Sequence, residues 1–236
     1  FAALAEGMGI TPLTAVATAA VREASDGMNF RDEVLRETGV KIWVIDGREE
    51  ARLSAQGVLL GWPGSYGLVC DIGGSSMELA DLAEGRVGRR VTSALGPLKL
   101  REIKGGKKAV KAYVKETMAQ LHSEMEGEKA MRLFLVGGSW RAIARIDMER
   151  RGYPLTVLHE YRMTARQISK TVDYIAMSDP TELRQRCNIS ESRMSLVPLA
   201  SIILKELMRV FKPKDVAVSS YGIREGMLYE QMPKEL

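Results

Sequence analysis

The sequence predicts an α/β fold of two domains, and three observations on its 236 residues support this prediction. Apolar runs rich in β-forming residues alternate with segments of helical periodicity along most of the chain. Two of the apolar runs end in a pair of glycines, where a strand turns into the next element. The sequence GWPGS at 61–65 is a break that separates a first α/β portion from the rest. We therefore predict domains at 1–62 and 63–236.

The first domain is expected to hold two strands and three helices. Asn29 is the expected N-cap of the second helix, and Gly39 takes the place of a C′ residue at its end. Glu49 and Glu50 lie in the first turn of the third helix, where carboxylates interact favourably with the helix dipole. The strands are predicted at 14–18 and 41–45, and the helices from 19 onward, at 30–38 and at 48–60.

The second domain is expected to begin with three strands joined as hairpins. Glu84 and Gly85 turn the chain between the second strand and the third. Apolar positions at helical spacing then indicate two long helices, and two further strands are each followed by a turn or loop and a helix. The predicted elements are strands at 66–72, 77–83 and 86–93, a helix at 110–125, a strand, turn and helix within 132–146, a helix around 199–210, and a strand, loop and helix within 215–230.

The composition is that of an ordinary soluble globular protein. The chain is 45% hydrophobic and 27% charged, so it can bury a core, and no segment approaches the ~20 apolar residues of a membrane span. The net charge of +4 slightly favours anionic partners, but no basic stripe typical of nucleic-acid binding stands out. Cys70 and Cys187 fit neither a zinc site nor a disulfide framework, which suits a reducing cytoplasm. We expect no nucleic-acid or membrane partner.

The loop after the first strand of the second domain has the sequence DIGGSS. Gly73 and Gly74 let the backbone approach a ligand closely, and their N–H groups can bind an anion together with the hydroxyls of Ser75 and Ser76. A tight turn between two strands explains the same residues equally well. A second turn of similar sequence follows another apolar strand and opens a helix, which favours the binding of phosphate. Its residues are Gly137, Gly138 and Ser139.

Other phosphate-binding motifs do not match. No G-x-G-x-x-G follows either strand, so a dinucleotide-binding Rossmann fold is not indicated. The sequence KGGKK at 104–108 has a lysine where a Walker A loop needs Ser or Thr, and no strand precedes it. We interpret this lysine cluster as a solvent-exposed part of the surface.

The glycine loop belongs to a set of five motifs. DIGGSSMEL resembles the D-[IL]-G-G-G-S-[TS]-E-[LF] loop of the exopolyphosphatase / guanosine pentaphosphate phosphatase (Ppx/GppA) family, a member of the actin-like ATPase superfamily. VATAAVREASDG, IDGREEARLSAQGV, LVGGSWRAIARI and SSYGIREGMLYE resemble four further motifs of that family, in the same order. Each motif alone is weak, but five in register across nearly the whole chain are specific.

The resemblance implies a fold, a reaction and partners. The fold would be the two-domain, actin-like ATPase (ribonuclease H-like) fold, with a first domain that lacks its N-terminal strands, because the family's opening D-x-G-S-x-S loop is absent and Phe1 starts within a helical pattern. The reaction would be hydrolysis of the terminal phosphate of inorganic polyphosphate or guanosine pentaphosphate, with magnesium as cofactor. Members of the family are commonly homodimers, and we expect the compact two-domain version without the extra C-terminal helical domains of longer relatives.

The resemblance also implies roles for single residues. Glu50 takes the place of the catalytic glutamate that activates the attacking water, and it should lie in a cleft that raises its pKa. Asp71 and Glu78 match acidic positions that hold or orient magnesium. Arg22 and Arg193 match arginines that face phosphate. The phosphate would lie on the two glycine turns, at Gly73, Gly74, Ser75, Ser76, Gly137, Gly138 and Ser139.

Some of these and nearby residues have structural interpretations. For Glu78 a surface salt bridge is an equal alternative, and for Glu49 the helix dipole is the preferred explanation. Arg224 and Glu225 are interpreted as a structural ion pair. Trp140 is interpreted as a packed aromatic residue rather than a contact to a nucleotide base.

Departures from the family pattern leave a second hypothesis open. Ser75 stands where the family has a third glycine, and Met77 removes a hydroxyl before the glutamate. A catalytically weakened homologue that binds polyphosphate or a nucleotide as a sensor or regulatory module would tolerate both changes. The presence of Glu50, Asp71 and Arg22 together favours the enzyme, since a pure binder needs no water-activating carboxylate.

Overall fold

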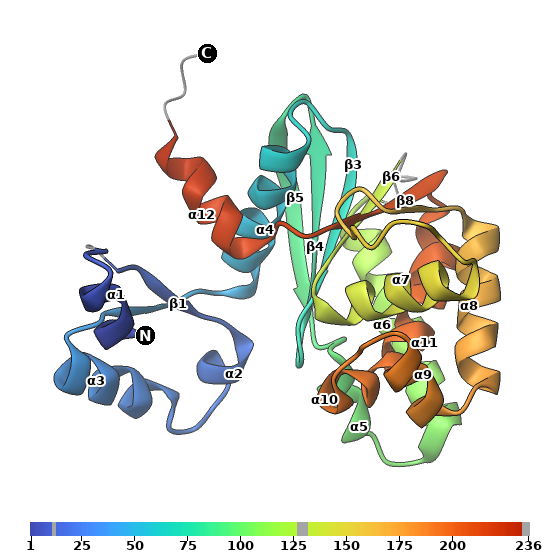
Figure 1. Cartoon of the computed structure of the whole chain (residues 1–236), viewed down its shortest axis with the longest axis horizontal. Helices are drawn as coiled ribbons and strands as arrows, with labels where there is room; N and C mark the ends of the chain where they lie inside the picture. Colours follow the sequence, from blue (N-terminus) through green and yellow to red (C-terminus); the bar gives the residue numbers. More distant parts are fainter. Residues whose placement is uncertain (11–12, 127–131, 233–236) are drawn as a thin grey trace.

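The computed structural model describes residues 1–10, 13–126 and 132–232, which form a large α/β body and a smaller N-terminal part (Figure 1). The body contains a six-stranded sheet with the strand order β5-β4-β3-β6-β8-β7. β3, β6 and β8 are parallel, and the other strands run antiparallel to their neighbours. The strands are β3 (Gly67–Ile72), β4 (Met77–Ala83), β5 (Arg86–Ser93), β6 (Arg132–Val136), β7 (Arg162–Met163) and β8 (Asp215–Ser219).

The central strands are apolar because helices cover both faces of the sheet. In β3, Val69 belongs to a core cluster with α4, whereas Leu68 and Cys70 belong to a larger cluster with α6, α7 and α11. Phe134 of β6 lies on the α4 face. Figure 1 shows α4 and α12 on one side of the sheet and the other three helices on the opposite side. The helices are α4 (Gly47–Gly61), α6 (Gly106–Glu124), α7 (Gly138–Arg150), α11 (Val197–Phe211) and α12 (Ile223–Gln231).

α4 and α12 pack closely because glycines lie at their contact. A Cβ at Gly57 would overlap the backbone of Gly222, and a Cβ at Gly226 would overlap the carbonyl of Leu53. Neither position has room for a methyl group. The contact therefore fixes α12 on the helix that carries Glu50.

Gly226→Ala should separate these two helices. Because the added methyl group meets backbone rather than a flexible side chain, we expect the free energy of unfolding to fall by about 1–3 kcal/mol. Urea unfolding measures this change. Gly7→Ala is the matched control, since a Cβ there meets nothing within 4 Å, and helix propensity alone favours alanine by up to about 1 kcal/mol. Equal effects of the two substitutions would contradict the close approach.

The N-terminal part is a two-stranded parallel sheet with short helices, and it lies at the left of Figure 1. Ala19 and Gly27 are the only buried residues that the structure describes before α4. Gly39 is left-handed with φ of 70° and ends α3, as predicted. The predicted N-cap Asn29 is wrong, because the helix already begins at Gly27. The elements are α1 (Ala2–Gly7), β1 (Ala15–Ala17), α2 (Ala19–Arg22), α3 (Gly27–Thr38) and β2 (Ile42–Val44).

The predicted domain boundary between residues 62 and 63 remains a prediction. α4 precedes this boundary, yet it packs on β3, β4 and β5 of the six-stranded sheet. Cys70 and Cys187 are buried and free, as expected of small core residues. Within the described ranges, no helix has the length and apolar character needed to cross a bilayer.

Four helices of the body were not predicted, although two carry clear start signals. Thr164 and Gln167 form a capping box at the start of α8, and the Asp179 side chain accepts from two backbone N–H groups at the start of α9. α8 packs on α7 and α11, where the Thr171 hydroxyl donates to buried Asp147, and α9 contacts α10 and buries Leu183. The four helices are α5 (Pro97–Arg101), α8 (Ala165–Met177), α9 (Pro180–Arg186) and α10 (Glu191–Met194).

Candidate active site

Three buried carboxylates come together on the α4 face of the sheet. Asp71 lies near the end of β3, and Glu78 on β4 is its register partner across the hairpin. Glu50 projects from the first turn of α4, which packs against both strands. The exposed fractions are 4% for Glu50, 9% for Asp71 and 1% for Glu78. The structure therefore unites the residues for which catalysis and metal binding were predicted.

Burial raises the pKa of all three carboxyls. At Glu50 burial is the main cause, and the charge of Asp71 adds to it. Burial raises the pKa of Glu78 to about 8, and the charge of Glu50 contributes next. The pKa of Asp71 is raised by burial and lowered in part by its bond with Ser54. Several perturbed carboxyls at one buried place are typical of a functional site.

Two of the carboxylates are held by partners on neighbouring elements. Arg22 donates from Nη1 to Glu50 Oε2 at 3.3 Å and to the carbonyl of Ile45 at 2.7 Å. The hydroxyl of Ser54 donates to Asp71 Oδ2. Arg22 therefore holds the predicted catalytic glutamate directly, in addition to any contact with phosphate.

Only one of the two carboxylate oxygens of Glu78 has a hydrogen-bond partner among the described residues. Thr92 donates from Oγ1 to Glu78 Oε1 at 3.0 Å, whereas the buried Oε2 has no hydrogen-bond partner among the described residues. The alternative of a surface salt bridge is wrong, because the side chain is buried and β4 points it at the other carboxylates. Glu49, in contrast, pairs with Arg52 at 2.5 Å, which agrees with its structural interpretation.

The raised pKa of Glu78 predicts a pH dependence of stability. An acid that binds its proton more tightly in the folded protein makes the free energy of unfolding fall as the pH rises from the carboxyl's ordinary pKa of 4.5 to about 8. We expect Glu78→Gln to remove this contribution, which for one group is at most about 1.4 kcal/mol per pH unit. Urea unfolding across this pH range measures the slope, with exposed Glu102→Gln as control. Wild-type slope in the Glu78 variant would contradict a buried, neutral Glu78.

The first glycine turn is both a hairpin turn and a source of free amides. The Gly73 N–H donates to the carbonyl of Ser76 at 3.0 Å and closes the turn. No described residue accepts a hydrogen bond from the N–H groups of Gly74, Ser75 or Ser76, and buried Ser76 Oγ also lacks a partner. The two interpretations of this loop are therefore compatible, and three amides and one hydroxyl can meet an anion.

The second glycine turn packs directly against the first. Gly137 has φ of +115°, and a Cβ there would lie 2.5 Å from the carbonyl of Ile72 and 3.2 Å from Asp71 Oδ1. A Cβ at Gly138 would lie 3.0 Å from Nε of Arg193 on α10. Because β3 and β6 are parallel neighbours, their ends meet at one edge of the sheet. The structure thus brings both turns, Ser139 and Arg193 to the same place.

Arg141 is a site residue that was not predicted from the sequence. It is half-buried on α7, one turn after the second glycine turn, and Nη1 donates to the carbonyl of Ser220 at 3.4 Å. Burial and the charge of Arg193 lower its pKa, whereas Asp71 raises it. The signal was available, since the matching family motif G-G-[TS]-x-[RK] has a basic residue at this position. Two neighbouring guanidinium groups at the turns suit an anionic ligand.

The predicted ion pair of Arg224 with Glu225 is wrong. Glu225 instead accepts from the Gly222 N–H at 2.8 Å at the start of α12. Exposed Arg224 forms no ion pair with a described residue, and its charge acts on Arg141. Two adjacent side chains on a helix point in different directions, which favours separate partners over a pair.

The donor set suits magnesium. This ion prefers oxygen ligands and retains water, so one or two carboxylates suffice beside phosphate oxygens. Asp71 and Glu78 offer carboxylates, and the unpartnered oxygens Glu78 Oε2 and Ser76 Oγ are buried beside them. In the part of the chain that the structure describes, no three or more His, Cys, Asp or Glu side chains form a metal cluster. Water or substrate would therefore complete the coordination.

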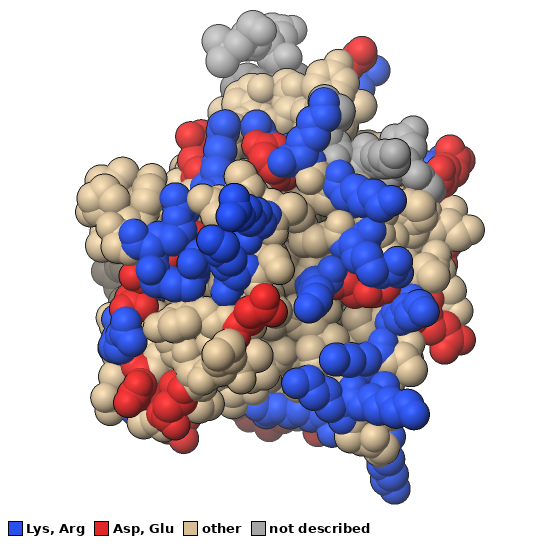
Figure 2. Space-filling view, turned by 90° about the vertical axis from the view of Figure 1, so that its right-hand side faces the viewer, with Lys and Arg blue, Asp and Glu red and all other residues tan. Residues whose placement is uncertain are grey.

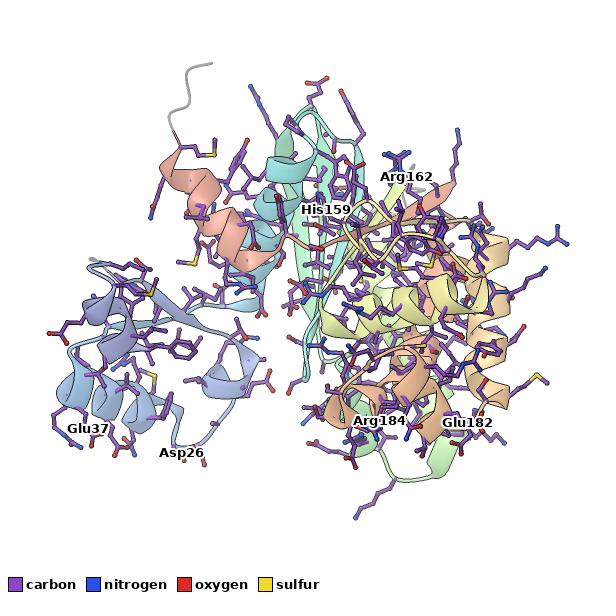
Figure 3. The ribbon with its side chains drawn as sticks, in the orientation of Figure 1. Asp26, Glu37, His159, Arg162, Glu182 and Arg184 are labelled. Carbon is purple, nitrogen blue, oxygen red and sulfur yellow. The ribbon has the colours of Figure 1, made fainter. Side chains whose placement is uncertain are left out.

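The aromatic and histidine residues near the sheet are structural. Trp140 is fully buried, as expected of a packed aromatic. His159 is labelled in Figure 3. Its ring lies between Trp62, which is tilted by 37° at a centroid distance of 4.5 Å, and Tyr221, which stacks on it at 4.6 Å. Its Nδ1 accepts from the Ser220 N–H at 3.3 Å, and burial lowers its pKa. The histidine belongs to a packed stack and not to a catalytic triad.

Comparison with known proteins identifies relatives of this chain. It is 23% identical over 254 residues to Retrograde regulation protein 2 of Saccharomyces cerevisiae, covering 98% of this chain and 43% of that protein. It is 26% identical over 274 residues to Exopolyphosphatase 1 of Mycobacterium leprae, covering 100% and 72%. The crystal structure of an exopolyphosphatase from Cytophaga hutchinsonii superposes with a TM-score of 0.87 at 20% identity, covering 98% and 78%. The chain thus spans less than half of the yeast protein and about three quarters of the others.

The superposition on these solved structures shows the fold of the chain. It is the actin-like ATPase fold, as predicted from the sequence. The model of the Ppx/GppA phosphatase family matches residues 1–235, nearly the full length. The five sequence motifs lie within this match, and the structure gathers residues from four of them at one site. The chain therefore belongs to the Ppx/GppA phosphatase family.

Proposed function

We propose that the protein is a phosphoanhydride hydrolase that releases the terminal phosphate of inorganic polyphosphate, with Glu50 as general base. One observation carries this proposal: Glu50 is buried beside Asp71 and Glu78, at the strand ends that also present both glycine turns. A carboxylate of raised pKa next to free backbone amides supplies a base and an anion site together.

Each residue of the site has a separate role in phosphoryl transfer. Glu50 Oε1 or Oε2 accepts a proton from the attacking water, and Arg22 orients the carboxylate through its bond to Oε2. The N–H groups of Gly74, Ser75 and Ser76 hold the oxygens of the phosphate that is transferred. Arg193 and Arg141 stabilise the negative charge that the transition state spreads over these oxygens.

Magnesium would be held by Asp71 and Glu78, and it would neutralise phosphate charge while the reaction proceeds. Binding of a divalent cation beside Glu78 also requires the ionised carboxylate, whose pKa burial raises to about 8. We therefore expect activity at a given magnesium concentration to increase as the pH rises through about 8 and to level off above it.

The charge of the surface supports an extended polyanion as substrate. Figure 2 shows many Lys and Arg side chains on the face that carries α8, with fewer Asp and Glu between them. A long phosphate chain is attracted to such a surface by its charge, whereas a nucleotide needs a pocket for its base. The exposed basic residues of α8 itself are Arg166 and Lys170.

A phosphate-release assay with polyphosphate and guanosine pentaphosphate side by side tests the proposal. Polyphosphate should be the better substrate, with a KM that rises with salt because surface charges contribute to binding. Release from neither substrate, with magnesium present, would contradict the enzymatic function.

A second candidate function is a regulatory module that binds polyphosphate or a phosphorylated guanine nucleotide. Ser75 and Met77 depart from the family loop, and one relative is named Retrograde regulation protein 2. Under this alternative the protein would bind polyphosphate without turnover. Binding measured together with phosphate release separates the two functions.

A further inference from the structure

β5 is the edge strand of the six-stranded sheet, and a groove runs along its outer side. In the described part of the chain, β5 pairs with β4 alone. A hollow of about 390 Å³ lies beside residues 88–91, and a second of about 340 Å³ lies beside residues 92–94. Glu124 of α6 lines both hollows, so they are adjacent. The two form one groove, which we call the β5 groove.

The first hollow is strongly basic. Arg48 reaches it from α4, and Arg89 and Arg90 reach it from β5. Arg89 pairs with Glu126, whereas Arg48 and Arg90 form no ion pair with any described residue. Glu124 also lines this hollow, but the three guanidinium groups outnumber its carboxylate and that of Glu126, so the hollow attracts an anion. Planar guanidinium groups match the oxygens of phosphate in a bidentate geometry.

The second hollow is polar, and the charged residues that line it are Glu116 and Glu124. Tyr113, Thr117 and Gln120 of α6 face Ser93 across it. These groups donate and accept hydrogen bonds, and the tyrosine ring adds a flat apolar surface. Glu124 lies between the hollows, where its carboxylate can accept from hydroxyl groups next to a bound phosphate. The second hollow therefore suits the hydroxyl-bearing part of a phosphorylated small molecule.

A basic edge strand also has a simpler explanation. Charged side chains on exposed edges protect sheets from pairing with other chains, and Arg86 fits that role because it lines neither hollow. The same explanation does not account for Arg48, which comes from a different element, or for the polar hollow that continues the cavity.

We propose that the β5 groove binds a phosphorylated small molecule, with its phosphate on Arg48, Arg89 and Arg90 and a hydroxyl-bearing body, such as ribose, in the second hollow. The groove lies outside the candidate active site, on the far side of β5 from β3. The two share one residue, since Thr92 lines the groove and donates to Glu78 at 3.0 Å. The proposal does not depend on the enzymatic function, because it concerns binding alone.

Calorimetric titration with ribose 5-phosphate and with inorganic phosphate tests the proposal. All proteins in this titration carry the substitution Arg193→Ala, which is expected to weaken phosphate binding at the candidate active site. Arg90→Gln should weaken ribose 5-phosphate by about tenfold or more, the effect of one charge-assisted contact. Arg86→Gln is the matched control and should bind with unchanged affinity. Equal affinities of the Arg90 and Arg86 variants would overturn the site.

Two further comparisons locate the ligand. Glu124→Gln should weaken ribose 5-phosphate severalfold but should not weaken inorganic phosphate, because only the former carries hydroxyls and the Glu124 carboxylate, which also lines the first hollow, repels phosphate. Equal effects on both ligands would overturn the assignment of the second hollow. If Arg90→Gln lowers the thermal midpoint, exposed Arg48→Gln replaces it with the same expected loss, and Arg90→Lys should recover part of the affinity.

Discussion

Replacement of Glu50 by glutamine is expected to lower kcat for phosphate release by about 10²- to 10⁴-fold, the usual contribution of a general base. Glutamine has the shape of glutamate but accepts no proton from water. The side chain is buried between α4 and the sheet, so the substitution changes little besides charge. Steady-state phosphate release with polyphosphate and magnesium measures the loss.

Glu49→Gln provides the matched control for this substitution. Glu49 lies in the same helical turn, but it is half-exposed and pairs with Arg52. We expect its kcat to stay within a few-fold of the wild type, since exposed pairs contribute little. Circular dichroism should show both variants folded. Similar kcat values for the Glu50 and Glu49 variants would rule out Glu50 as the base.

Gly137→Ala is expected to reduce kcat/KM by about 10²-fold or more. The backbone φ of +115° disfavours any residue with a Cβ, and the new methyl group would lie 2.5 Å from the carbonyl of Ile72 and 3.2 Å from Asp71 Oδ1. The turn must therefore move away from β3, which displaces Asp71 relative to the first glycine turn. Displacements of about 1 Å have costs of this size.

Gly152→Ala separates backbone strain from steric overlap. Gly152 also has a positive φ, +60°, but a Cβ there meets nothing within 4 Å. We expect a modest loss of stability, about 1 kcal/mol, and unchanged kcat/KM. Full activity in the Gly137→Ala variant would show that the two glycine turns do not have to touch for the reaction.

The strands of the body were predictable because their sequences combine β-forming residues with turn signals. β3, β4 and β5 match the predicted ranges to within one residue, and Glu84 and Gly85 turn the chain between β4 and β5 with φ of 52° and 70°. The short helices α9 and α10 were missed, since seven or four residues show no clear periodicity.

The sequence predicted which residues belong to the site, but it predicted only some of the contacts between them. Glu50 and Asp71 could be selected from motifs, but their separation in sequence says nothing about α4 packing on β3. The pairing of Arg22 with Glu50 and the half-satisfied state of Glu78 depend on side-chain geometry. Arg141 was missed because it lies inside a helix whose apolar pattern explained the segment sufficiently.

A crystal structure of the Glu50→Gln protein with polyphosphate and magnesium tests the central claim most directly. We predict that the terminal phosphate lies on the N–H groups of Gly74 to Ser76, next to Arg193, with a water molecule between it and residue 50. A terminal phosphate bound away from the glycine turns, or residue 50 turned away from it with no shared water, would contradict the claim.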